Sequence, residues 1–372
     1  MTAAGILDRL LGASELHPAG RRIEDLETPV PVVDLDIALA NLVRWQDHLD
    51  GLGIANRPHI KTHKLALLAQ LQVALGARGI TVQKLGEAEV MAEAGLADQL
   101  LTFNVVGAAK LARLKALARR IDIAVVADSP GVVEGLAEAG RSAGRDIRVL
   151  VECDTGAGRC GVQTPQAAHD LALAIDRHSG VTFGGLMTYP KSGTRARTAA
   201  FLEEAVAHLR QAGLEARTVS SGGSPDMWSS EGLSAVSEYR AGTYIYNDRS
   251  LVARGTGRVE DCALTVAATV VSRPTPGRAI LDSGSKALTS DLMGLTGFGS
   301  VPAHGDAVVY EVSEEHGFLG VADDARVPAV GDVVRVLPNH CCPVSNLFDR
   351  IVLVKGGEVI GSVAVDARGR SQ

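Results

Sequence analysis

From Thr28 onwards, short apolar runs alternate with longer runs that are rich in alanine and leucine. Short runs of β-branched residues are typical of buried strands, whereas helical spacing of apolar residues is typical of amphipathic helices. The pattern predicts strands at Val30–Leu35, Ile54–His59, Gly79–Gln83, Gln99–Phe103, Ile121–Val126, Arg148–Cys153, Thr182–Met187 and Thr218–Ser221. Helices are expected between them, for example at Gly86–Ala94, Lys110–Arg119, Gly131–Arg141 and Thr164–Arg177.

Strands that alternate with helices at this spacing indicate parallel βαβ units. Eight such strands in roughly 220 residues favour an α/β protein with a (β/α)8 barrel as its N-terminal domain. An open sheet that binds a dinucleotide is less favoured, because no Gly-x-Gly-x-x-Gly follows the first strand.

Beyond Gly255 the pattern changes to short β-type runs separated by Gly, Pro and Asp. These runs lie at Ala263–Ser272, Arg278–Leu281, Ala307–Val312, Val333–Leu337, Ile351–Lys355 and Val359–Ala364. They predict a second, mostly antiparallel β domain. We therefore expect an N-terminal arm over 1–27, the barrel over 28–252 and the C-terminal β domain over 253–372.

Composition narrows the function classes. The 372 residues are 46% hydrophobic and 22% charged, which is ordinary for a globular protein. With 3% aromatic residues, a net charge of -6 and no basic block, a nucleic-acid role is not expected. Neither a membrane-spanning run nor a signal peptide is evident. Five cysteines in a long chain do not suggest a disulfide framework, so we expect a cytoplasmic protein.

The segment Arg57-Pro58-His59-Ile60-Lys61-Thr62-His63-Lys64 brings two lysines and two histidines to the predicted end of the second strand. Parallel α/β folds build their chemistry at the carboxyl-terminal rim of the sheet. A lysine held there between apolar walls can be neutral at working pH, as a Schiff-base nucleophile requires. A basic strand end that meets solvent or an acidic surface is the alternative, and the cluster alone leaves both interpretations open.

This segment also resembles the pyridoxal-phosphate lysine segment of the D-threonine aldolase and D-serine dehydratase family, whose barrel is of the alanine-racemase type. The resemblance runs from about Thr28 to the end of the chain. It implies pyridoxal 5'-phosphate as the cofactor, with Lys61 rather than Lys64 as the Schiff-base lysine. It also implies that the N-terminal arm packs with the C-terminal domain and that the protein is a homodimer.

Two segments are candidates for a phosphate cradle. One is Ser220-Ser221-Gly222-Gly223-Ser224, after the eighth predicted strand, and the other is Arg240-Ala241-Gly242-Thr243-Tyr244. Glycines let backbone N–H groups approach a phosphate, and hydroxyls add further donors. The cofactor-binding residues expected here are Ser221, Gly222, Gly223, Arg240, Gly242, Thr243 and Tyr244.

Two arginines are expected at the cofactor ring. The segment Glu152-Cys153-Asp154-Thr155-Gly156-Ala157-Gly158-Arg159-Cys160-Gly161 is similar to the alanine-racemase-type Asp-Thr-Gly-x-x-Arg-x-Gly. The resemblance places Arg159 beside the cofactor's phenolic oxygen. Arg240, in an Arg-x-Gly match, becomes the partner of the ring nitrogen, which its permanent charge would keep unprotonated. A structural pair between Arg240 and Glu238 or another acid is the alternative.

Tyr189 and His316 are the remaining catalytic candidates. Tyr189 aligns with a family active-site tyrosine and is expected to orient the substrate. The chain departs from the family beside it, because Pro190-Lys191-Ser192 follows where the family generally has a histidine. His316 matches a family Glu-His-Gly and is either the base for the substrate hydroxyl or a group behind the site. A solvated salt bridge with its acidic neighbours is the alternative.

The run His340-Cys341-Cys342-Pro343 predicts a metal site. On an extended strand, His340 and Cys342 would point to one face and Cys341 to the other. A nitrogen and a sulfur ligand favour zinc, with manganese or magnesium as alternatives. The resemblance is mixed here, because His-x-Cys is similar to the dehydratases whereas the following Asn346-Leu347-x-Asp349 is similar to the aldolases.

Together these residues predict a pyridoxal-phosphate- and metal-dependent lyase that acts on D-3-hydroxy-amino acids. Aldol cleavage to glycine and an aldehyde is favoured by the residues around the metal pair. Elimination by a D-serine dehydratase-like or D-3-hydroxyaspartate-type enzyme would need the same residues and remains the alternative. A racemase or a non-catalytic pyridoxal-phosphate carrier is less favoured, because neither accounts for the His-x-Cys pair after Gly255.

Overall fold

The computed structural model describes residues 2–13, 22–322 and 327–372. The chain folds into two compact units that interleave along the sequence. The barrel unit consists of Gln46–Lys61, Gln72–Gly242 and Arg370–Gln372, and the β unit of Met1–Trp45, Thr62–Leu71 and Thr243–Gly369. Within the described residues, no helix is long and apolar enough to cross a membrane.

The barrel unit is built on an eight-stranded parallel sheet in the order β2-β9-β8-β7-β6-β5-β4-β3. A parallel bridge between His59 and Thr81 joins its two outer strands, so the sheet closes into a barrel. The strands are β2 (Ala55–Asn56), β3 (Ile80–Val82), β4 (Asp98–Leu101), β5 (Asp122–Ala127), β6 (Ile147–Cys153), β7 (Val181–Thr188), β8 (Thr218–Ser221) and β9 (Glu238–Tyr239). The expected (β/α)8 barrel is therefore confirmed.

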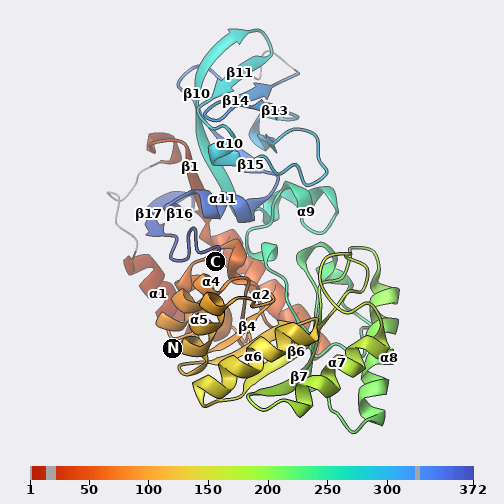
Figure 1. Cartoon of the computed structure of the whole chain (residues 1–372). Coiled ribbons are helices and arrows are strands. Elements are labelled where there is room, and N and C mark those ends of the chain that lie inside the picture. Colours follow the sequence, from red (N-terminus) through yellow and green to blue (C-terminus); the bar gives the residue numbers. More distant parts are fainter. Residues whose placement is uncertain (1, 14–21, 323–326) are drawn as a thin grey trace. The chain divides into compact units, whose positions relative to one another are not determined.

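Helices cover the outside of these strands (Figure 1). They are α4 (Leu85–Glu93), α5 (Ala108–Ala118), α6 (Pro130–Ala143), α7 (Pro165–Arg177) and α8 (Arg195–Gln211). Their ends follow ordinary capping chemistry: the Thr164 hydroxyl accepts a hydrogen bond from Ala167 N at the start of α7, and Gly144 ends α6 in the left-handed conformation. Inside the barrel, alternate strand residues form a buried apolar cluster of Leu100, Ala124, Val126, Leu150 and Met187.

The β unit contains a nine-stranded sheet in the order β11-β14-β13-β12-β15-β10-β1-β16-β17. An additional pairing of β10 with β11 closes its first six strands into an antiparallel barrel. The strands are β1 (Val30–Asp34), β10 (Leu264–Thr275), β11 (Arg278–Leu281), β12 (Gly299–Ser300), β13 (Val308–Val312), β14 (Gly317–Gly320), β15 (Val333–Pro338), β16 (Arg350–Lys355) and β17 (Glu358–Ala364). The predicted antiparallel domain is thus observed, with one parallel pair, β1 and β16.

Further helices complete the described part of the chain. Two of them, α2 (Leu35–Leu52) and α3 (Ala66–Ala74), each contribute residues to both units. The others are α1 (Ala3–Ala13), α9 (Arg249–Ala253), α10 (Ser285–Leu288) and α11 (Cys341–Leu347), with 3-10 turns η1 (Ile23–Asp25), η2 (Ile60–Thr62), η3 (Ser224–Ser229), η4 (Thr243–Ile245), η5 (Val259–Asp261) and η6 (Pro302–His304).

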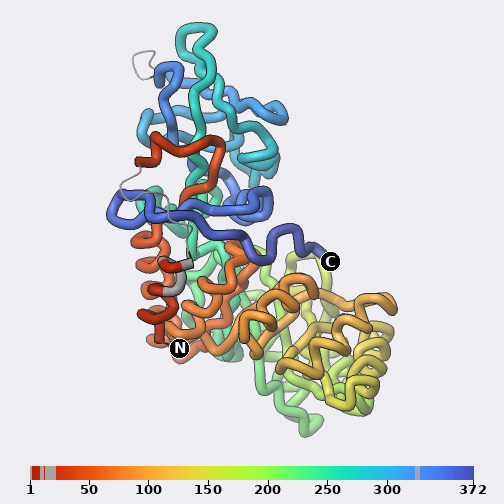
Figure 2. Tube along the Cα trace, turned by 90° about the vertical axis from the view of Figure 1, so that its left-hand side faces the viewer, coloured from red at the N-terminus to blue at the C-terminus, as the bar shows by residue number. Residues whose placement is uncertain are grey.

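One predicted barrel strand was wrong. Val30–Asp34 does not open the barrel but pairs antiparallel with β10 and parallel with β16, so an early segment of the chain lies beside a late one (Figure 2). Leu26 and Val32 accordingly share an apolar cluster with Val352 and Val354. An apolar run predicts a buried strand but does not say which sheet buries it. The missing barrel strand is β9, whose two residues, Glu238 and Tyr239, form no apolar run.

Candidate active site

Lys61 lies in the short turn η2, directly after the strand β2, at the carboxyl-terminal rim of the barrel unit. Its side chain is half-buried. His59, two residues earlier, is buried and lies 3.0 Å from Gln83 Oε1 through its Nε2 atom. Burial, followed by the nearby charge of Lys61, lowers the pKa of His59 well below its usual value. His59 is therefore neutral at physiological pH and adds no positive charge beside Lys61.

The second lysine of this segment, Lys64, has a structural role in the β unit. Its backbone is in the left-handed region at φ 57°. Its Nζ donates to Asn346 Oδ1 at 2.9 Å and to the Ala367 carbonyl at 3.4 Å. These two hydrogen bonds hold the Lys64 amine in place, which suits an anchor and not a nucleophile.

The residues after β8 line a pocket of about 400 Å³. Ser221 Oγ is buried there and has no hydrogen-bond partner in the described structure. Gly222 has φ +100°, and a Cβ atom at this position would lie 2.3 Å from the ring of Tyr239. The pocket is lined by Pro190, Gly193, Arg195, Thr198, Ser221, Gly222, Asp226, Ser229, Leu233 and Tyr239. An unpartnered buried hydroxyl beside a glycine that admits no side chain fits a ligand with several acceptor oxygens, such as a phosphate.

The other cradle residues fall on both sides of a unit boundary. In the barrel unit, Gly242 N donates to Ser224 Oγ at 3.2 Å, which joins the two predicted cradle segments. A Cβ at Gly223 would lie 2.8 Å from the Tyr189 ring, so this loop also packs on the predicted substrate tyrosine. Thr243 and Tyr244 belong to the β unit, where the Tyr244 ring packs against Trp45 at 5.9 Å between centroids.

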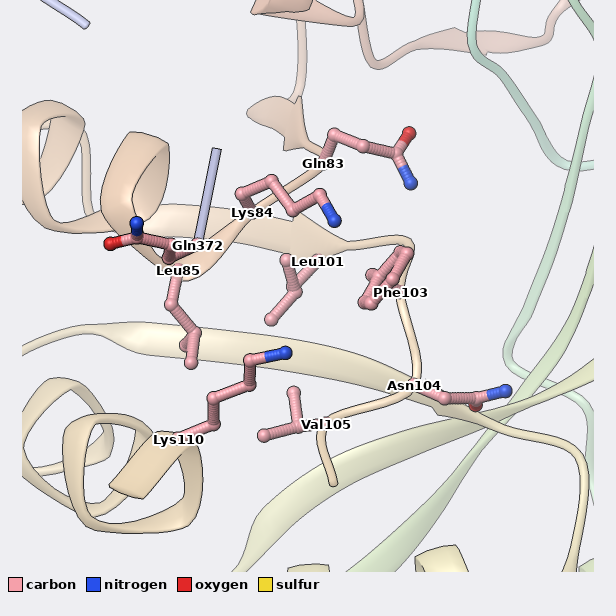
Figure 3. A pocket seen from close by; sticks show the side chains of 9 residues that line it. All are labelled: Gln83, Lys84, Leu85, Leu101, Phe103, Asn104, Val105, Lys110 and Gln372. Atoms are coloured by element: carbon pink, nitrogen blue, oxygen red, sulfur yellow. The ribbon is translucent and has the colours of Figure 1, made fainter. Parts of the chain in front are cut away.

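A second, much smaller hollow of about 10 Å³ lies beside β4 in the barrel unit (Figure 3). Lys84 Nζ lies 3.7 Å from the centre of the Phe103 ring, and Lys110 Nζ lies 6.0 Å from it. This volume has room for about one water molecule. It is therefore too small to be the substrate site.

Arg159 and Tyr189 meet at the carboxyl ends of β6 and β7. Asp154 accepts hydrogen bonds from Gly156 N at 2.8 Å and Gly158 N at 3.1 Å, which shapes the loop that carries Arg159. The Arg159 guanidinium lies over the Tyr189 ring, 5.0 Å from its centre. Tyr189 is 38% exposed, so one of its faces remains accessible. The two predicted site residues are thus brought together by a cation–π contact.

Arg240 is buried and held by the barrel wall. Its guanidinium donates to Ser220 Oγ at 2.8 Å and to the Thr188 carbonyl at 2.8 Å. Ser220 in turn donates to Glu238 Oε1 at 2.6 Å, so Arg240 reaches Glu238 through a hydroxyl and not by a direct pair. Burial lowers the pKa of Arg240 to about 10, and it therefore stays charged at neutral pH.

Glu152 is a site residue that sequence reasoning did not single out. It is buried on β6 and is paired in register with Met187 on β7, which lies in the barrel interior. Burial, with a smaller contribution from the charge of Asp128, raises the pKa of its carboxyl to about 7. The sequence feature that could have identified Glu152 is an acidic residue in an otherwise apolar strand, at a position that faces the barrel interior.

The metal pair lies in the β unit, but not on a strand. His340 is the N-cap residue of α11, and Cys341 and Cys342 form the first turn of that helix, so the expected strand geometry was wrong. At the start of this helix the two thiols still differ in exposure, because Cys341 is fully buried whereas Cys342 is partly exposed. Cys342 Sγ lies 3.1 Å from Thr62 Oγ1. The strand interpretation failed because β15 ends at Pro338, before the pair is reached.

His340 is oriented by a carboxylate. Its Nδ1 lies 2.7 Å from Asp291 Oδ2, so Nε2 is the nitrogen that would bind a metal. Burial lowers the pKa of His340, but hydrogen bonds with Cys342 and Asp291 outweigh burial and raise it to about 9. Among the described residues, no group of three or more His, Cys, Asp or Glu side chains is arranged to hold a metal. If His340 and Cys342 bind a metal, solvent or substrate would have to supply the remaining ligands.

The residues that follow the pair have structural partners. Asn346 Oδ1 accepts hydrogen bonds from Lys64 Nζ and from Gly369 N at 3.0 Å. Asp349 forms an ion pair with Arg368 at 2.9 Å. The aldolase-like Asn346-Leu347-x-Asp349 therefore anchors the C-terminal segment, and its contacts in the β unit are not chemical evidence for either reaction.

His316 lies in the hairpin between β13 and β14 and is exposed. Its carbonyl accepts a hydrogen bond from Ser313 N at 2.9 Å. In the described part of the chain its imidazole makes no hydrogen bond or ion pair, whereas its neighbour Glu315 pairs with Lys286. In the described residues His316 therefore does not form the alternative salt bridge with its acidic neighbours. Its catalytic role stays a prediction.

Comparison with known proteins agrees with this geometry. The alanine racemase N-terminal domain matches residues 33–250, and the putative serine dehydratase domain matches residues 263–354. A D-threonine aldolase from Arthrobacter sp is 36% identical, with 95% of this chain and 96% of that protein covered. A D-threo-3-hydroxyaspartate dehydratase from Delftia sp. (strain HT23) is 33% identical over 87% of this chain and 93% of that protein.

Solved structures are similar too. The D-threonine aldolase from Filomicrobium marinum is 32% identical, with a TM-score of 0.90, and the match covers 96% of this chain and 100% of that one. Structures of D-threo-3-hydroxyaspartate dehydratase include a histidine-to-alanine mutant and a cysteine-to-alanine mutant, the latter in a metal-free form, at positions two residues apart.

The fold and the site residues define a protein of the alanine-racemase type with an added dehydratase-like domain. Within this class, the chain belongs to the family of D-threonine aldolases and D-3-hydroxyaspartate aldolases and dehydratases. The resemblance inferred from the lysine segment is thereby confirmed.

The buried carboxyl of Glu152 predicts a pH-dependent contribution to stability. Because its pKa is raised to about 7 in the folded protein, the folded state holds the proton more tightly than the unfolded state. The Glu152 carboxyl makes its full favourable contribution to the free energy of unfolding at pH values below its pKa in the unfolded chain. That contribution is lost as the pH rises through its pKa in the folded protein. We expect the free energy of unfolding, relative to Glu152→Gln, to fall by about 3 kcal/mol at most between pH values near 4.5 and 7.

Chemical denaturation at a series of pH values measures this difference. Glu134→Gln, which changes an exposed glutamate on α6, is the matched control and should leave the pH profile unchanged. Parallel profiles for Glu152→Gln and the wild type would show that Glu152 titrates normally.

Proposed function

We propose that the protein is a pyridoxal-phosphate- and divalent-metal-dependent lyase that cleaves D-3-hydroxy-amino acids to glycine and an aldehyde. The observation that carries the proposal is the near full-length likeness to D-threonine aldolases in a chain that has a lysine at the barrel rim and a His-x-Cys pair. The alanine-racemase-type fold alone would also fit a racemase, but it would not account for that pair.

The barrel unit offers a group for each part of the cofactor. Lys61 would bind it covalently through Nζ, and Ser221, Gly222 and Gly223 would hold its phosphate, with Gly242 beside them. Arg159 would face the phenolic oxygen. When bound, pyridoxal phosphate withdraws electrons from the α-carbon of an amino acid. A charged, buried Arg240 can only donate hydrogen bonds, so a ring nitrogen that faces it would remain an acceptor.

The β unit offers the metal ligands. His340 would bind through Nε2, because Asp291 engages its Nδ1 atom, and Cys342 would bind as a thiolate. Imidazole and thiolate together favour zinc over magnesium or manganese. A divalent metal with open positions lowers the pKa of a bound hydroxyl group. Two protein ligands leave such positions open for the β-hydroxyl of the substrate.

Cleavage and elimination place different demands on the same residues. Carbon–carbon cleavage requires that the β-hydroxyl lose its proton, for which His316 is our candidate base and Tyr189 the candidate for orienting the substrate. Elimination requires removal of the α-proton. The Lys61 amine could accept this proton after the substrate amine has displaced it from the cofactor. The cysteine in the metal pair favours this second function, D-serine dehydratase-like or 3-hydroxyaspartate dehydratase-like, since a relative of the latter kind has a matching mutant in a metal-free form.

Products decide between the two functions. Incubated with D-threonine, the protein should yield glycine and acetaldehyde, and with D-threo-3-hydroxyaspartate it should yield glycine and glyoxylate. A keto acid with ammonia, from D-serine or from hydroxyaspartate, would make elimination the function. If no D-3-hydroxy-amino acid is consumed by metal-loaded protein, both proposals fail. L-Threonine is the control and should not react.

Lys61→Ala should abolish the absorption band that pyridoxal phosphate acquires when it binds to a lysine of the protein. Lys64→Ala should retain the band, because this lysine is an anchor, but it should lower the melting temperature through loss of the hydrogen bonds to Asn346 and Ala367. Absorption spectroscopy and thermal denaturation test both variants. The assignment would be reversed if only Lys64→Ala lost the band.

Cys342→Ser should greatly reduce the metal content of the purified protein, measured by elemental analysis, because a hydroxyl is a poor ligand for zinc. Cys341→Ala, at the adjacent buried thiol, is the matched control and should leave the metal content unchanged. Chelator treatment should remove turnover and keep the absorption band. Full activity in metal-free protein would disprove the metal proposal.

The expected homodimer and cytoplasmic location stay predictions.

A further inference from the structure

Thr62, which follows Lys61 in the chain, has a buried hydroxyl that meets the sulfur of Cys342. The Oγ1 and Sγ atoms are 3.1 Å apart, and Thr62 is fully buried. Both residues belong to the β unit, to which the segment Thr62–Leu71 contributes. In the described structure the Thr62 hydroxyl has no other hydrogen-bond partner, so the sulfur alone fixes its direction.

The direction of this hydrogen bond follows from the chemistry of the ligand. A cysteine that binds a metal does so as a thiolate, which has no proton to donate. The Thr62 hydroxyl must then donate to Sγ. Thr243 Oγ1, at 3.7 Å, approaches the same sulfur from a second side. The neighbouring Cys341 is fully buried, and its backbone N donates to the carboxylate of Asp248.

We infer that Thr62 is a positioning residue that orients the Cys342 sulfur for metal binding. The inference rests on the proposed metal site. A donated hydrogen bond holds the sulfur in one rotamer and stabilises the lone pairs that the metal would share. Cys342 sits in the first turn of α11 and is partly exposed, and it also interacts with His340 and Cys341. The buried Thr62 hydroxyl adds a contact to the sulfur that comes from a distant part of the chain. Thr243 gives weaker support, in keeping with its longer distance.

Cobalt(II) is the probe that makes this role visible, because zinc has no absorption spectrum and a thiolate–cobalt bond gives a charge-transfer band. Thr62→Val removes the hydroxyl and keeps the shape, whereas Thr62→Ser keeps the hydroxyl. We expect Thr62→Val to bind cobalt roughly 10- to 100-fold more weakly. Its charge-transfer band should move to longer wavelength, because the sulfur lone pairs are no longer stabilised. Thr62→Ser should restore both properties.

Competition with a metal-binding dye gives the affinity, and absorption spectroscopy gives the band. Thr265→Val is the matched control, since Thr265 bonds Arg335 at 2.9 Å elsewhere in the β unit. Circular dichroism checks the fold, and Thr62→Ala is measured in the same way if Thr62→Val does not fold. Wild-type affinity and an unshifted band in the variant that lacks the hydroxyl would overturn the inference and leave the metal site intact. A wild-type protein without a thiolate–cobalt band would overturn the metal pair itself, and the role of Thr62 with it.

Discussion

The buried ion pair between Arg57 and Glu238 is the interaction on which the barrel site depends. Glu238 is fully buried and uses both carboxylate oxygens, one for Arg57 Nε at 2.6 Å and the other for Ser220. Ser220 then accepts a hydrogen bond from Arg240. Removing one partner of such a pair leaves an uncompensated buried charge, at a cost of roughly 3–5 kcal/mol. The position of the proposed ring-nitrogen partner therefore depends on the charges that hold β2 and β9 together.

This pair also explains which parts of the fold could be predicted from the sequence. Strands with apolar runs, such as β5 and β6, were predictable because burial requires those runs. β9 was not, because ladder hydrogen bonds and a charged pair hold its two residues. β1 was recognised as a strand but assigned to the wrong sheet, since its buried residues would suit either one. The hydrophobic pattern of a segment predicts that the segment is buried. The strands with which it pairs determine the sheet in which it is buried.

The site was predictable to the extent that its chemistry is local in sequence. Lys61, Arg159 and the Ser221–Ser224 segment carry local motifs. Thr62 and Glu152 lie inside the motif segments and Asp291 lies outside them, but no motif predicted the contacts of these three residues. Such contacts form only when distant segments meet, as when Asp291 reaches His340 across 49 positions. The same limit explains why Asn346 looked diagnostic of aldol cleavage. The motif identified the residue type, whereas the contacts of Asn346 with Lys64 and Gly369 give it an anchoring role in the described structure.

Two contacts of the proposed metal ligand lie next to the points where the chain passes from one unit to the other. The chain passes from the barrel unit to the β unit between Lys61 and Thr62, and again between Gly242 and Thr243. Both crossing points fall inside proposed site segments, the lysine turn and the second cradle segment. In the β unit, the residues just past the two crossings, Thr62 and Thr243, both approach the sulfur of Cys342. Each crossing therefore joins, along the chain, a proposed cofactor residue to a residue that contacts the proposed metal ligand. A substitution at either threonine removes a contact of the proposed metal ligand at a position that directly follows a proposed cofactor residue in the chain.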